Sequence, residues 1–221
     1  MKLFFQAILK FFLGVFLVGI LIFLPAGTLS YWQGWLLMGI LFIPMFLAGI
    51  VMLIKNPVLL KSRLDAKEKE KKQSLVVKLS GLMFLTGFIL AGLSVRFDWY
   101  TLPRWVSITA SALFLIAYLL YAEVLRENTY LSRTIQVQHN QKVIDTGLYG
   151  IVRHPMYSAT LLLFLSMPLI LGSLYAFAVF LSYPVIIGVR AKHEEEFLKE
   201  NLDGYADYMK KVKYRLIPFI W

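Results

Sequence analysis

Long apolar stretches dominate the sequence and constrain its fold more than any other feature. Four of them, at residues 4–24, 32–54, 75–95 and 105–122, hold roughly 20 residues each, which is the length that an α-helix needs to cross about 30 Å of hydrocarbon. Two shorter stretches, 156–171 and 174–189, are separated by Gly172 and Ser173. Because backbone polar groups must be paired inside a bilayer, such stretches become helices. The sequence therefore predicts an all-α fold, a polytopic transmembrane bundle of about six helices whose last two form a tight hairpin.

Charged residues fall mainly in the loops, and their distribution predicts the orientation of the chain. The connections at 25–31, 96–104 and 172–173 contain only Arg96 and Arg104, whereas the other 21 of the 23 Lys and Arg residues belong to the opposite face. Cationic loops favour the cytoplasmic side. We therefore expect an integral membrane protein with both termini in the cytoplasm, in the plasma membrane of a prokaryote or the endoplasmic reticulum of a eukaryote.

Composition removes several classes of function. The chain has no cysteine, and its three histidines lack the spacings of common metal motifs, so we expect no disulfide, thiolate nucleophile or metal site. The net charge of +10 lies in loops beside membrane segments, which favours membrane lipids over nucleic acid as partners. The basic stretch 55–74 is expected to be a solvated loop. Apart from Lys10, the first four segments carry almost no ionisable residue at depth, which disfavours a channel or a proton-coupled transporter.

Polar chemistry is concentrated in the last 100 residues. We divide the chain into N-terminal helices with a basic loop (1–122) and a cofactor-binding half (123–221), within one integrated membrane domain. Pro155 disfavours helical geometry at His154 and suits the first turn of a helix, so a helix is expected to start at Pro155. Arg153 and His154 then lie just outside it, at the level of the lipid headgroups, where anchoring to headgroups would be their simplest role.

The predicted hairpin brings a second polar group to the same place. Arg190, Glu194 and Glu195 follow its returning segment and must meet Arg153 and His154 at the mouth, although a solvated helix end would also explain them. Such a mouth offers carboxylates for a cation, an arginine for a carboxylate and aromatic faces for a ring or a sulfonium. These features match S-adenosylmethionine, while several charged nucleotides satisfy part of them.

The tail after Phe197 carries apolar residues at a helical period. This pattern predicts an amphipathic C-terminal helix on the cytoplasmic side, lying on the membrane surface or over the mouth of the bundle.

Three motifs together resemble a known family. The stretches "GLYGIVRHPMY", "RAKHEEEFL" and "GYADYMKKVKYRLIPFIW" are similar to the isoprenylcysteine carboxyl methyltransferase and phospholipid methyltransferase superfamily of integral membrane enzymes, over about residues 128–221. The resemblance implies a helical bundle whose C-terminal half holds S-adenosylmethionine and admits a lipidic acceptor from the bilayer. The cofactor-binding residues that it implies are Gln136, Gln141, Lys142, Val143, Ile144, Tyr149, Arg153, His154, Pro155, Met156, Tyr157, Glu194 and Glu195.

The same resemblance assigns catalytic roles to Arg190, which would also bind the acceptor, and to His154. Because Glu196 follows directly, the register of the glutamate pair is open by one residue. We expect a methyltransferase acting on a lipidic or prenylated acceptor, most like isoprenylcysteine carboxyl O-methyltransferase. A carboxylate acceptor needs no general base, whereas a phospholipid amine must first lose a proton, which His154 or a glutamate would accept. The alternatives are a phospholipid amine N-methyltransferase, a membrane reductase with a nicotinamide cofactor in the same pocket, and a non-enzymatic transporter.

Overall fold

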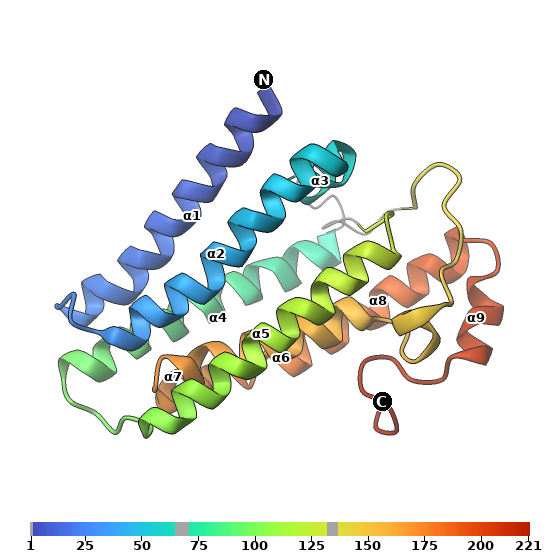
Figure 1. The fold of residues 1–221 in the computed structure, drawn as a ribbon. Helices are drawn as coiled ribbons and strands as arrows, with labels where there is room; N and C mark the ends of the chain where they lie inside the picture. Colours follow the sequence, from blue (N-terminus) through green and yellow to red (C-terminus); the bar gives the residue numbers. More distant parts are fainter. Residues whose placement is uncertain (1, 65–70, 132–136) are drawn as a thin grey trace.

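The computed structural model describes residues 2–64, 71–131 and 137–221, and within these ranges the regular structure is helical apart from one isolated β-bridge between Thr101 and Ser173 (Figure 1). The predicted all-α class is confirmed. The long helices of the bundle are α1 (Lys2–Ala26), α2 (Trp32–Lys55), α4 (Lys71–Arg96) and α5 (Arg104–Glu127).

Among the described residues, five helical stretches are long and apolar enough to cross a membrane: four are these helices, and the fifth covers residues 174–201. In the most apolar window of the first helix only 6% of the residues are buried inside the protein. A surface this apolar and this exposed is suited to lipid rather than to water. The shorter α6 (Pro155–Ile170) packs along α5, and its 16 residues extend over about 24 Å.

The sequence predicts that alternate loops lie at opposite ends of the bundle, and their positions confirm it. Figure 1 shows the connections α1–α2, α4–α5 and α6–α7 at one end of the bundle, and the N-terminus, α3 and α9 toward the other. The basic segments therefore share the end that carries α9. That this end faces the cytoplasm stays a prediction from the charge distribution.

The returning arm of the hairpin differs from the expected single helix. It consists of α7 (Leu174–Phe180) and α8 (Tyr183–Asn201), interrupted at Leu181 and Ser182. Pro184 contributes to the interruption because it has no amide to donate to the preceding turn, although it fits the first turn of a new helix. Helix α8 also continues beyond Val189, the expected end of the segment. The acidic residues that follow the apolar region therefore belong to the same helix.

The basic stretch after the second span needs a correction as well. Residues 57–64, expected as a solvated loop, form the helix α3 (Pro57–Leu64), in which Leu59 and Leu60 are buried. Two cations fix this helix to the bundle: Lys10 Nζ donates to the carbonyl of Leu64 at 2.6 Å, and Arg63 donates to the Tyr121 hydroxyl. These contacts and the burial of two leucines stabilise α3. Of the rest of the predicted loop, residues 65–70 lie outside the described residues and residues 71–74 belong to α4.

The C-terminal tail folds over the end of the bundle. The predicted amphipathic stretch is divided by Gly204, whose φ of +81° is a left-handed conformation that glycine adopts without steric cost. Helix α9 (Tyr205–Lys211) follows, and its apolar side buries Tyr205 and Tyr208 in a cluster with Leu202 and Val212. The apolar face of the tail therefore packs against the protein, as the second of the two predicted arrangements requires.

Candidate cofactor site

Helix α6 begins at Pro155, as predicted, and His154 is its N-cap residue. The two residues before the helix are fixed by the C-terminal tail. The amide of Arg153 donates to the carbonyl of Tyr214, and the amide of His154 to that of Arg215, both at 2.9 Å. Backbone hydrogen bonds to the C-terminal tail therefore fix the orientation of both side chains.

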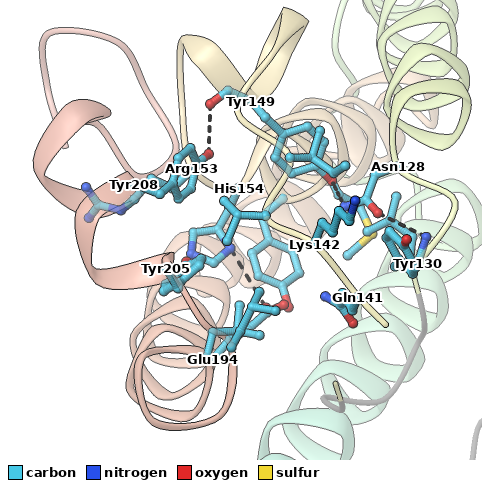
Figure 2. Close-up of a pocket in the computed structure, with 17 residues that line it drawn as sticks. Asn128, Tyr130, Gln141, Lys142, Tyr149, Arg153, His154, Glu194, Tyr205 and Tyr208 are labelled. Atoms are coloured by element: carbon cyan, nitrogen blue, oxygen red, sulfur yellow. Dashed lines mark hydrogen bonds and ion pairs between the residues drawn. The ribbon is translucent and has the colours of Figure 1, made fainter. Parts of the chain in front are cut away.

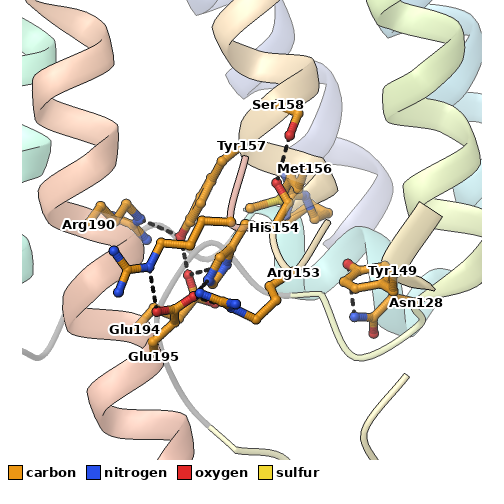
Figure 3. Close-up of polar contacts among 12 residues, drawn as sticks. Asn128, Tyr149, Arg153, His154, Met156, Tyr157, Ser158, Arg190, Glu194 and Glu195 are labelled. Atoms are coloured by element: carbon orange, nitrogen blue, oxygen red, sulfur yellow. Dashed lines mark hydrogen bonds and ion pairs between the residues drawn. The ribbon is translucent and has the colours of Figure 1, made fainter. Parts of the chain in front are cut away.

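Glu195 is the centre of a buried ionic cluster (Figure 3). Its Oε1 accepts hydrogen bonds from Arg153 Nε at 2.6 Å and His154 Nε2 at 3.2 Å, and its Oε2 from Arg215 Nε at 2.8 Å. The Arg153 guanidinium also donates to the carbonyls of residues 212–213. The predicted meeting of the two ends of the hairpin is confirmed, and Glu195, which is 3% exposed, joins α8, the start of α6 and the tail.

Glu194 faces a different direction from Glu195, since successive residues of an α-helix are turned by about 100°. Its carboxylate accepts a hydrogen bond from the Tyr157 hydroxyl, and it lines a pocket that Glu195 does not. The Nδ1 atom of His154 lies 3.8 Å from Glu194 Oε2, and Arg190 Nε donates to the Tyr157 oxygen at 3.0 Å. The sequence left open which of the adjacent glutamates would bind a ligand. Of Glu194 and Glu195, Glu194 is the one that a ligand in the pocket would contact.

The pocket lies between the segment that follows α5, the loop 141–144, η1 (Gly147–Gly150), the start of α6, α8 and α9 (Figure 2), and has a volume of about 90 Å³. Arg190, Pro155 and Glu195 are not among its lining residues, and Gln136 lies outside the described residues. The other predicted cofactor residues line it, namely Gln141, Lys142, Val143, Ile144, Tyr149, Arg153, His154, Met156, Tyr157 and Glu194.

Seven further lining residues were not predicted: Asn128, Tyr130, Leu131, Leu198, Leu202, Tyr205 and Tyr208. The four residues after Phe197 had a signal in the helical period, which indicated an apolar face without showing what that face covers, and Tyr205 and Tyr208 also belong to the tail motif. The three residues at 128–131 had no such signal. Tyr208 donates to the Tyr149 carbonyl at 2.7 Å, and Asn128 donates to the Tyr149 hydroxyl at 3.0 Å. Burial raises the pKa of Tyr149 and Tyr208, so both phenols are uncharged at neutral pH.

A glycine turn brings Tyr149 into the pocket. The carboxylate of Glu127, at the end of α5, accepts a hydrogen bond from the Leu148 amide at 3.0 Å. Gly147 has a φ of +50°, and a Cβ added there would overlap that carboxylate. Glycine is needed at this position both for its backbone conformation and for the close approach of Glu127. On the surface beyond the turn, Lys211 of α9 pairs with Asp145 at 2.6 Å.

The pocket combines one carboxylate with several aromatic rings. The His154 and Tyr157 rings are stacked, with centroids 5.4 Å apart, and Tyr149, Tyr205 and Tyr208 add further faces. No cluster of potential metal ligands occurs in the described ranges. A carboxylate beside aromatic faces is suited to an organic cation that also carries a ring.

Comparison with known proteins identifies the region that forms this pocket. Residues 105–203 match the family model described as phospholipid methyltransferase. This part of the chain is therefore similar to a family of phospholipid methyltransferases. The matched region, residues 105–203, contains α6 and α8, nearly all of α5, and all residues that line the pocket except Tyr205 and Tyr208.

The chain is also similar to a reductase. The Delta(14)-sterol reductase TM7SF2 of Mus musculus is 30% identical over 91 residues, which cover 40% of this chain and 22% of the reductase. The chain thus spans about a fifth of the length of that relative, and the similarity concerns a segment of it.

Proposed function

We propose that the protein is an S-adenosylmethionine-dependent methyltransferase with a lipidic acceptor, and that the acceptor is the carboxylate of an isoprenylcysteine. The observation that carries the proposal is the carboxylate of Glu194 facing an aromatic pocket, most of which is built by the region similar to phospholipid methyltransferases. The family supports methyl transfer, and the pocket offers the chemistry that a cationic methyl donor needs. With the basic loops at the same end, the pocket would open to the cytoplasm.

The residues present fit S-adenosylmethionine in chemical type. Glu194 would hold its ammonium group, and the rings of Tyr149 and Tyr157 offer faces to a sulfonium or an adenine. Bound there, the cofactor supplies an electrophilic methyl group on a positively charged sulfur. The enclosed space of about 90 Å³ is smaller than typical ligand pockets of about 300–1,000 Å³. Binding would therefore require outward movement of part of the lining, for example of residues 141–144, which lie outside the helices.

Arg190 would orient an acceptor that arrives from the bilayer. Val185 and Val189, one helical turn apart on α8, are 70% and 44% exposed, so that side of the helix would contact lipid, and the half-buried Arg190 follows it directly in the chain. Through the Tyr157 hydroxyl, Arg190 is linked to Glu194. An acceptor carboxylate is already deprotonated and needs no base, so orientation by Arg190 and exclusion of water would supply much of the acceleration.

A phospholipid amine is the second candidate acceptor, and the description of the matching family favours it. An ammonium group must lose its proton before it attacks the methyl group. His154 would be the base: Glu195 fixes the ring through Nε2, and Nδ1 points toward Glu194 on the pocket side. The similarity to a sterol reductase makes binding of a nicotinamide cofactor the third possibility to test.

The test combines binding and transfer with the purified protein in lipid nanodiscs. Titration calorimetry should show binding of S-adenosylmethionine and none of NADPH; the reverse result would refute the proposal. With a methyl-labelled cofactor, we expect transfer to a prenylcysteine analogue and release of labelled methanol on treatment with base, which is characteristic of a methyl ester. Base-stable label on phosphatidylethanolamine would instead identify an N-methyltransferase.

Site variants connect this activity to the pocket. Glu194→Ala and His154→Ala should lose cofactor affinity while they are produced at normal levels. Unchanged affinity in both variants would show that these residues have a structural role only.

A further inference from the structure

The hydroxyl of Tyr205 is the least satisfied polar group of the pocket. Its side chain is 4% exposed, it lines the pocket, and within the described ranges its oxygen has no hydrogen-bond partner. The other buried tyrosines of the lining differ: Tyr157 bonds to Glu194, Tyr208 to the Tyr149 carbonyl, and Tyr149 to Asn128. A buried hydroxyl without a partner destabilises a fold, so its position against the pocket suggests that a ligand supplies the partner.

The charges around Tyr205 indicate what kind of partner fits. Burial raises the pKa of Tyr205, and the neighbouring carboxylates of Glu194 and Glu195 raise it further. The phenol is therefore uncharged, and two carboxylates act on its oxygen against one guanidinium, that of Arg153. Such a position favours a cationic donor over an anion. An ammonium group has three N–H donors, and Glu194 would use one or two of them.

We propose that the Tyr205 oxygen accepts a hydrogen bond from the ammonium group at the amino-acid end of the cofactor, beside Glu194. The inference rests on the proposed function and adds a binding residue to it. Tyr205 lies beyond residues 105–203, which match the family. It reaches the pocket because Gly204 turns the chain from the end of α8 into α9, where Tyr205 packs against Tyr208 with ring centroids 5.6 Å apart.

Tyr205→Phe tests the proposal because it removes one oxygen and keeps the ring. The melting temperature should stay the same or rise, since an unpaired buried hydroxyl is lost. Calorimetry with S-adenosylhomocysteine, the demethylated cofactor, should show binding about 2- to 10-fold weaker than in the wild type, the loss that corresponds to one hydrogen bond. The analogue of this ligand without its α-amino group should bind equally well to both proteins.

Tyr208→Phe is the matched control, because its hydroxyl already bonds to the Tyr149 carbonyl. It should lower the melting temperature and weaken both ligands by a similar factor. A Tyr205→Phe protein that binds S-adenosylhomocysteine as tightly as the wild type would overturn the inference. So would an equal loss of affinity for the two ligands. A wild-type protein that binds neither S-adenosylmethionine nor S-adenosylhomocysteine would refute the proposed function itself.

Discussion

Removing the charge of Glu195 should mainly lower stability, whereas removing the charge of Glu194 should mainly weaken ligand binding. Glu195→Gln acts on the buried cluster in which the carboxylate accepts hydrogen bonds from Arg153, His154 and Arg215. The Arg153 side chain is 7% exposed, so water cannot replace the lost counter-charge. Glu194→Gln acts on a carboxylate that faces the pocket, so its main effect should be on ligand binding.

The magnitude for Glu195 follows from these contacts. Breaking a buried ion pair by removing one partner costs about 3–5 kcal/mol, and the remaining amide oxygen of glutamine places the loss near the lower limit, about 3 kcal/mol. For a chain of this size, 1 kcal/mol lowers the melting temperature by about 2–4 °C, so the expected decrease is about 6–12 °C. Glu194→Gln should change the melting temperature little and weaken S-adenosylmethionine by about 10- to 100-fold, the value of a hydrogen bond to a charged group.

Intrinsic tryptophan fluorescence during heating measures the first effect, since the chain has five tryptophans, and calorimetry measures the second. Both variants should be compared in the same detergent at the same lipid content. The reasoning is refuted if Glu195→Gln melts within about 2 °C of the wild type, or if Glu194→Gln is the variant that loses stability.

Three further changes test other parts of the structure. Arg190→Lys should raise the KM for a prenylcysteine acceptor about 10-fold or more while cofactor affinity stays near that of the wild type, because lysine lacks the planar fork that pairs with a carboxylate; equal KM values would remove Arg190 from the acceptor site. Gly147→Ala should lower the melting temperature by several degrees, because alanine is strained at positive φ and its Cβ would overlap a glutamate side chain, whereas Gly39→Ala in α2, with open space around it, should not. Lys211 lowers the pKa of Asp145, so their contact contributes stability above the ordinary carboxyl pKa and loses it as the pH falls through the lowered pKa; the hydrogen-exchange protection factors of residues 141–146, corrected for the intrinsic rate at each pH, should decrease on acidification in the wild type and should already be low at neutral pH in Asp145→Asn.

Some features of the site follow directly from local chemistry and were predictable. The lengths of the apolar stretches determine the spans, because hydrocarbon tolerates few other backbone structures. Pro155 sets the start of α6 through its own ring. The two residues Gly172 and Ser173 make the hairpin tight, which is why Arg153 and Glu195 meet although 42 positions separate them.

Other features depend on how the elements pack and were not predictable from one sequence. The charge count of 55–74 suggested a loop, but contacts of Lys10 and Arg63 with distant partners stabilise α3. The break between α7 and α8 had a local signal in Pro184, but the apolar composition is continuous across it and favoured a single helix.

By itself, the sequence determined that the chain crosses a membrane, that its polar residues gather at one end, and that Arg153 and His154 precede a helix beside two glutamates. Tertiary structure alone decided which glutamate faces the pocket, because this depends on the rotation of α8 about its axis, which packing fixes. Tertiary structure also decided that Tyr205 lines the pocket. The hydrophobic period of the tail shows that one face is apolar. Whether this face packs against lipid or against protein depends on which contact buries more apolar surface away from water.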